Sequence, residues 1–180
     1  MLLKFFNTEL YNKVFEMLIE IPDYFNSCNE SVRVLVKELI DLFFKVPNEL
    51  LLLEDIVDIF IKIQYKAELF QTLINKIAVA QTPTLPLLIK VLQSMISADD
   101  QDKEQLHRAL QPCLKLLIKI FKDQINNGMA EVRKSVVFCL VELKFLLDNN
   151  EFLEIIQNFE ASHQKLVSVY IMRRNANNCE

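Results

Sequence analysis

The sequence from Met129 to Leu147 reads MAEVRKSVVFCLVELKFLL. Its apolar residues recur at helical spacing and predict one long helix with a continuous apolar stripe. We expect this helix to be buried against neighbours on more than one side, and residues 165–175 to close over it. The stripe consists of Val132, Val136, Leu140, Leu143 and Leu147.

Glycine is almost absent from the chain, with 1 residue in 180. Doubly wound sheets, phosphate-binding loops and tight hairpins need Gly where the backbone takes a positive φ or approaches another group closely. Only Gly128 is available for such a role. Apolar residues make up 52% of the chain and include 13 Phe, so core material is ample. The predicted class is therefore all-α.

Caps, prolines and apolar periodicity predict about eight helices, most of them joined by short loops. Pro112 predicts a kink or a division of its helix into two shorter ones. We expect a single domain over residues 1–175 and a polar tail over residues 176–180. The expected helices cover residues 8–19, 30–46, 49–64, 66–79, a segment from Pro86 to Ser97, 103–125, 129–147, 152–158 and a last helix capped by Ser162 that carries Leu166, Val169 and Tyr170.

Two helices begin in the same way, Glu30-Ser31-Val32-Arg33 and Glu131-Val132-Arg133. The recurrence favours helical repeats of about 40–47 residues, in which each hairpin covers the apolar faces of the next. The predicted architecture is a stack of antiparallel helical hairpins, an α-solenoid, and a four-helix bundle with additions is the alternative. Overlaying the two starts also aligns three further pairs of apolar residues, Val36 with Val136, Ile40 with Leu140 and Phe43 with Leu143.

The formal net charge is −4, and it is unevenly distributed. Residues 1–100 hold 9 Lys and Arg against 14 Asp and Glu, whereas residues 101–180 hold 11 against 10. Neither part has the basic footprint that phosphate backbones require, so we expect no nucleic-acid partner. The longest stretch without charge runs from Ile77 to Ile89 and contains two prolines, which is too short and too broken to span a bilayer. We therefore expect no membrane partner.

Candidate chemistry is sparse. His107 and His163 have no acid, base or Cys partner at a recognisable spacing, and the acidic group Glu54-Asp55 with Asp58 is typical of a solvated helix face. The cysteines show no C-x-x-C spacing and indicate buried or surface thiols in a reducing compartment, the cytosol or the nucleus. We expect no enzyme activity, no cofactor and no metal site. The four cysteines are Cys28, Cys113, Cys139 and Cys179.

Two stretches resemble the C-terminal end of CLASP-family proteins, the CLIP-associating, microtubule-stabilising proteins: VRKSVVFCLV at residues 132–141 and KLVSVYIMRR at residues 165–174. The Val-Arg opening of the helices also resembles the HEAT repeat, in which that Arg braces adjacent repeats. The resemblance implies a TOG-like HEAT-repeat domain at the end of a larger protein, and a short, divergent fungal member would account for the short repeats. It assigns Arg33 and Arg133 to the inter-repeat contacts, and partner binding is the alternative role for both.

The resemblance also implies a function. In that family the C-terminal domain recruits adaptor proteins of the plus-end, kinetochore, cortical or Golgi type, and it contributes to self-association. The implied location is the cytoplasmic cytoskeleton and the mitotic spindle, which is nuclear in closed mitosis.

Two alternatives stay open. One is direct tubulin binding as a TOG domain, although the chain has no Trp, and its first predicted loop offers Asp23, Tyr24 and Phe25 but no cation. The other is a HEAT scaffold in an assembly of another kind.

The last two predicted hairpins carry the candidate partner-binding residues. Large apolar groups rimmed by Lys and Arg are typical of the centre of a protein interface. Phe145 is the candidate aromatic anchor, with a core position as the alternative. The candidate set is Lys134, Lys144, Phe145, Lys165, Arg173 and Arg174.

Overall fold

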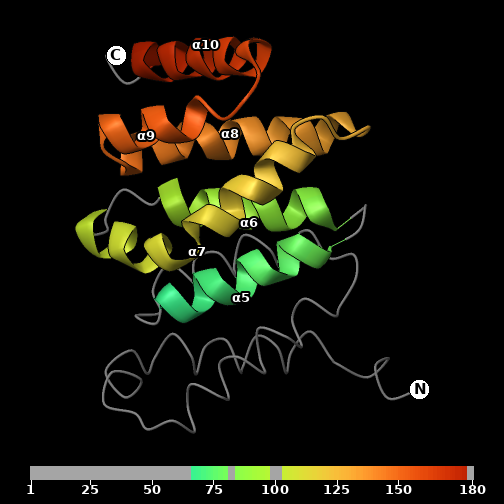
Figure 1. The fold of residues 1–180 in the computed structure, drawn as a ribbon, viewed down its shortest axis with the longest axis vertical. Helices are drawn as coiled ribbons and strands as arrows, with labels where there is room; N and C mark the ends of the chain where they lie inside the picture. The colour runs from blue at the N-terminus through green and yellow to red at the C-terminus, as the bar shows by residue number, and fades with distance from the viewer. Residues whose placement is uncertain (1–65, 81–83, 98–102, 178–180) are drawn as a thin grey trace, which may run out of the picture. The chain divides into compact units, whose positions relative to one another are not determined.

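The computed structural model describes residues 66–80, 84–97 and 103–177 (Figure 1). All of these residues form helices or the short turns between them, so the predicted all-α class is confirmed for this part of the chain. The three helices predicted over residues 8–64 lie outside the described residues. The helices are α5 (Lys66–Val79), α6 (Leu85–Ser97), α7 (Lys103–Gln124), α8 (Ala130–Leu146), α9 (Asn149–Ile156) and α10 (Ala161–Asn177).

The chain divides into two compact units, Met1–Lys66 and Ala67–Glu180. Nearly all of the described residues belong to the second unit. The single domain expected over residues 1–175 stays a prediction.

Helix α8 is the centre of the second unit. It packs against α6, α7, α9 and α10, and the predicted stripe from Val132 to Leu147 is buried throughout (Figure 1). Between Ser135 and Leu143 every residue is buried except Phe138, which is half-buried. A helix that is apolar on all sides needs neighbours on all sides, and the expectation of burial on more than one side is confirmed.

Helices α5 and α7 follow their apolar periodicity. The bounds of α5 agree with the predicted helix, and its stripe at Leu69, Leu73 and Ile77 is buried. Helix α7 is a single continuous helix through Pro112, so the predicted division into two helices is wrong. The side chain of Pro112 is exposed, and the turns on both sides of it bury a shared stripe that keeps the helix together. That stripe consists of Leu106, Leu110, Leu114, Leu117 and Phe121.

The observed starts of the last two described helices differ from the predicted ones. Helix α9 begins at Asn149 rather than Phe152, because the side chain of Asp148 accepts a hydrogen bond from the Glu151 N–H and caps the first turn. Helix α10 begins at Ala161, so Ser162 lies within the helix and is not its cap. Among the apolar residues of α10, Val167 is the one that is fully buried.

We predict that Leu140→Ala, at the centre of α8, lowers the free energy of unfolding by about 3 kcal/mol, because a fully buried leucine leaves a cavity that its neighbours fill only in part. Urea titration followed by circular dichroism measures the change. Leu153→Ala on α9, where the leucine is half exposed, is the matched control and should cost about 0.5 kcal/mol or less. Equal costs at the two positions would contradict the central place of α8.

Candidate functional site

The candidate partner-binding residues lie on α8 and α10, which pack against each other. The structure brings four of them, Lys134, Phe145, Arg173 and Arg174, into contact with aromatic rings or charges of these two helices. Lys144 instead reaches the first residue of α9, where its Nζ contacts the Asn149 side-chain oxygen. Lys165 is exposed on α10.

Glu142 and Arg174 form the ion pair that joins α10 to α8. Glu142 is the one charged residue among the buried residues of the described helices, and its carboxylate contacts the Arg174 Nη1. The Arg174 guanidinium also lies 4.5 Å from the centre of the Phe145 ring, within the range of a cation–π contact. A buried carboxylate needs such a partner, because an unpaired charge in the interior is costly. Two of the candidate residues therefore help to hold the two helices together.

An aromatic pair with a cation at each end lies on the same helix pair. The rings of Phe138 on α8 and Tyr170 on α10 meet edge to face, with centroids 5.2 Å apart and an interplanar angle of 82°. The Lys134 Nζ lies 5.6 Å from the Phe138 ring centre, and the Arg173 guanidinium lies 5.4 Å from the Tyr170 ring centre. Both cations are on exposed residues, so the pair presents aromatic and positive surface together.

A groove opens beside this aromatic pair, with a volume of about 520 Å³. We call it the α8–α10 groove. Its walls combine apolar and aromatic side chains with basic ones, and no Asp or Glu is among its described lining residues. These are Ile125, Asn126, Ala130, Arg133, Lys134, Val137, Phe138, His163, Leu166 and Tyr170.

Arg133 also closes the turn between α7 and α8. Its Nη1 donates to the Asn127 carbonyl at 2.6 Å and to the Gly128 carbonyl at 3.0 Å. The inter-repeat role that the HEAT resemblance assigns to Arg133 stays a prediction, and Arg33 lies outside the described residues.

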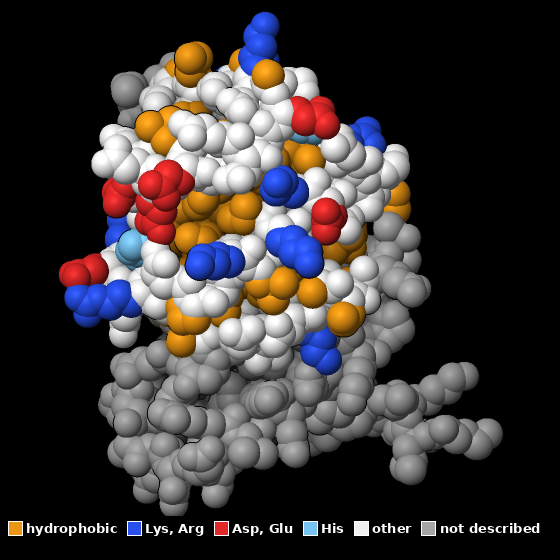
Figure 2. Space-filling model, viewed as in Figure 1, with side chains coloured by type: hydrophobic (Ala, Val, Ile, Leu, Met, Phe, Trp, Pro, Cys, Tyr) orange, Lys and Arg blue, Asp and Glu red, His pale blue; other side chains and the backbone are white. Residues whose placement is uncertain are grey.

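A second groove, of about 580 Å³, runs between α7 and α9 and carries both signs of charge. Lys115, Lys119 and Lys122 line its α7 side, while Glu151 and Glu154 line its α9 side. Figure 2 shows a face on which apolar surface is exposed between basic and acidic side chains.

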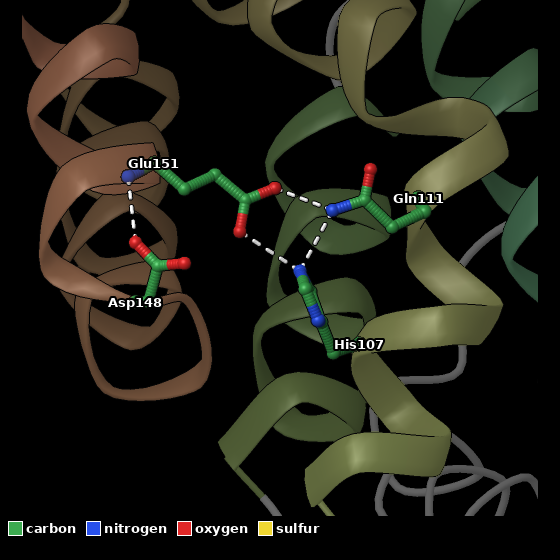
Figure 3. Close-up of polar contacts among 4 residues, drawn as sticks. All are labelled: His107, Gln111, Asp148 and Glu151. Carbon is green, nitrogen blue, oxygen red and sulfur yellow. Dashed lines mark hydrogen bonds and ion pairs between the residues drawn. The ribbon is translucent and has the colours of Figure 1, made fainter.

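His107 has an acid partner that the sequence did not reveal (Figure 3). Its Nε2 lies 2.8 Å from the Glu151 carboxylate, so the expectation that this histidine is without a partner is wrong. The two residues are far apart in sequence, and only the packing of α9 against α7 brings them together. The sequence feature that bears on this contact is the helix cap at Asp148, because it places Glu151 in the first turn of α9.

The Glu151 carboxylate accepts from two groups of α7. The His107 Nε2 contacts one oxygen of the carboxylate, and the amide of Gln111 donates to the other oxygen. The Gln111 amide nitrogen also lies 2.7 Å from the His107 Nε2, so the three side chains form one polar cluster. No Ser, Thr or Cys is among the described residues that line the neighbouring groove. The arrangement is a polar contact that docks α9 on α7.

The two described cysteines, Cys113 and Cys139, are both buried and free. Of the two predicted possibilities, buried or surface thiols, these two cysteines follow the first. Burial raises the pKa of the Cys113 thiol, which donates to the Gln71 side-chain oxygen at 3.1 Å. Burial and the nearby Glu142 charge raise the pKa of the Cys139 thiol well above its usual value. Since the thiolate is the reactive form, both sulfurs are poor nucleophiles.

In the described ranges, no three His, Cys, Asp or Glu side chains are grouped so that they could hold a metal ion. No helix in those ranges has both the length and the apolar character needed to cross a membrane.

Known proteins give no direct assignment. No family model matches this chain, and no curated protein matches its sequence.

We predict that Arg174→Met lowers the free energy of unfolding by about 2 kcal/mol, because the Glu142 carboxylate loses its partner in a buried position. Adding Glu142→Gln to that variant should recover part of the loss, since the unpaired charge is then gone. Urea titrations of the wild type, both single variants and the double variant measure the coupling. If the losses in free energy of unfolding of the two single variants add up to that of the double variant, the pair does not fix α10 on α8.

We predict that His107→Ala and Glu151→Ala each lower the free energy of unfolding by about 1 kcal/mol, because each removes one side of a partly buried hydrogen bond. The double variant should cost less than the sum of the two. His163→Ala, on α10, serves as the control for loss of an imidazole elsewhere. A double variant that costs the full sum would contradict the docking role of this contact.

Proposed function

We propose that this chain is a non-catalytic protein-interaction module of a CLASP-like protein and that it recruits adaptor proteins of the plus-end or kinetochore type. The proposal rests on the resemblance at residues 132–141 and 165–174, the same residues that build the α8–α10 pair. The single observation that carries it is the outward face of α10.

That face leaves apolar side chains in solvent. Leu166, Val169 and Met172 follow one another at a spacing of three residues and are 42%, 37% and 69% exposed. The opposite side of the helix carries the fully buried Val167. Lys165 and Arg173 flank the exposed apolar residues. Contiguous apolar surface rimmed by basic residues is typical of a protein-interaction site, which supports a role in recruitment.

The finer architecture belongs to the same proposal. We propose that the helices form a HEAT-repeat or TOG-like stack, an α-solenoid of antiparallel hairpins. Two features support it: the described connections from α7 to α10 are short turns, and α8 packs both on α6 and on α10. In a solenoid, each helix pair covers the apolar surface of the next, and the last pair keeps a free outer face.

The location and the remaining partners follow from the proposed family. The module acts in the cytoplasmic cytoskeleton and at the mitotic spindle, and self-association is a further role of the family's C-terminal domain. Direct tubulin binding is the alternative. Its candidate residues, Tyr24 and Phe25, lie outside the described residues.

The test is a parallel binding measurement on the full chain. Purified CLIP plus-end protein and αβ-tubulin are each titrated with the chain at low ionic strength, where surface electrostatic contacts are strongest, and complexes are detected by light scattering. We predict saturable binding to the CLIP protein and none to tubulin. Met172→Ser, which removes the most exposed apolar residue of α10, should weaken the complex about tenfold, whereas Val79→Ser on α5 should not.

Binding to tubulin without binding to the CLIP protein would make the tubulin-binding alternative correct. Binding to neither protein would contradict the proposed recruitment of plus-end adaptors.

A further inference from the structure

The α8–α10 groove has the composition of a docking site for a charged peptide. Its apolar part comes from Val137 and Phe138 on α8 and from Leu166 and Tyr170 on α10. Its volume, about 520 Å³, falls within the range of about 300–1,000 Å³ that is typical of ligand sites. The groove also adjoins the exposed stripe of α10 through Leu166, so its apolar surface continues along the helix.

The charge of the groove is of one sign. Arg133, Lys134 and His163 line it, and the two acids of α8 are paired with other cations. The Glu131 carboxylate lies 3.9 Å from Lys90 on α6, and Glu142 is paired with Arg174. No described acid therefore neutralises the basic residues at the groove.

Donors remain on these basic residues. Arg133 uses Nη1 for the two backbone carbonyls of the turn, and a guanidinium carries five N–H donors, so Nη2 and Nε can serve a carboxylate. The Lys134 ammonium lies over the Phe138 ring, at the edge of the apolar surface. A ligand that places an apolar group on Phe138 brings a neighbouring acid close to Lys134.

We infer that the α8–α10 groove binds an acidic peptide segment of a partner protein, with one apolar side chain of that segment packed against Phe138 and Leu166 and its carboxylates on Arg133 and Lys134. This inference rests on the proposed function, since it assigns the place and the chemistry of adaptor docking. A nucleic acid fits less well. Phosphate backbones are held by many cations spaced along the strand, whereas this groove offers a few cations around an apolar surface.

The experiment is a fluorescence anisotropy titration of the full chain into a labelled Glu-rich peptide with one central Phe. Two comparison peptides replace every Glu with Lys, or the Phe with Ala. We expect saturable binding of the first peptide and at least about tenfold weaker binding of both others. Raising the ionic strength from about 0.01 M to about 0.15 M should weaken the complex, because surface charge pairs are screened.

Two variants of the groove have matched controls outside it. Lys134→Glu and Leu166→Ser should each weaken binding about tenfold. Lys119→Glu on α7 makes the same charge change at another exposed lysine, and Leu153→Ser on α9 removes another exposed leucine. Both controls should bind within about twofold of the wild type. Circular dichroism of all four variants checks that they are folded.

Three results would overturn the inference: no binding of the Glu-rich peptide, equal binding by Lys134→Glu and its control, or competition by a single-stranded oligonucleotide that binds more tightly than the peptide. Titration of the same variants into purified CLIP protein separates this inference from the proposed function. If Lys134→Glu and Leu166→Ser bind CLIP as well as the wild type does, the groove assignment is wrong and recruitment stands. If the wild type itself fails to bind CLIP, the proposed recruitment of plus-end adaptors fails irrespective of the peptide result.

Discussion

The burial of α8 on all sides is the constraint on which the second unit depends. From Ser135 to Leu143 nearly every side chain is removed from water, and one of them is the carboxylate of Glu142. Helices α6, α7 and α9 also pack on α8, but a buried charge requires an opposite charge. Arg174 supplies it from the far end of α10. The Glu142–Arg174 pair is thus one of the contacts that hold α10 on α8 beside the α8–α10 groove.

The proposed function rests on the difference between the two sides of α10. One side of the helix packs on α8 through Val167, the Phe138–Tyr170 ring pair and the Arg174 ion pair. The other side keeps apolar and basic groups in solvent, where they lower solubility unless a partner covers them. The buried thiol of Cys139 and the His107–Glu151 contact are explained by packing. The exposed apolar and basic groups of α10 are the features on which the proposed recruiting role rests.

Periodicity predicted the helices because their stripes are regular. The bounds of α5 and the buried stripe of α7 follow directly from leucine and isoleucine spacing, and Pro112 did not break α7 because the stripe continues through it. The sequence could not reveal contacts between distant positions. The His107 partner lies on another helix, and the orientation of α10 depends on Glu142, which resembles any polar residue of a surface helix until its neighbours are known. The candidate basic residues could be identified from the sequence. Which of them pack against another helix and which are exposed could not, because that also depends on contacts between distant positions.

Native-state hydrogen exchange on the full chain measures whether α8 is the most protected of the described helices, because the exchange rate of a backbone amide reports how strongly its helix is protected from opening. We predict that amides from Val136 to Leu143 exchange only through global unfolding and are the slowest of the described helices. Amides of α10 should exchange faster, since one side of that helix faces solvent. Exchange in α8 as fast as in α10 would show that α8 is not the core on which the binding groove is built.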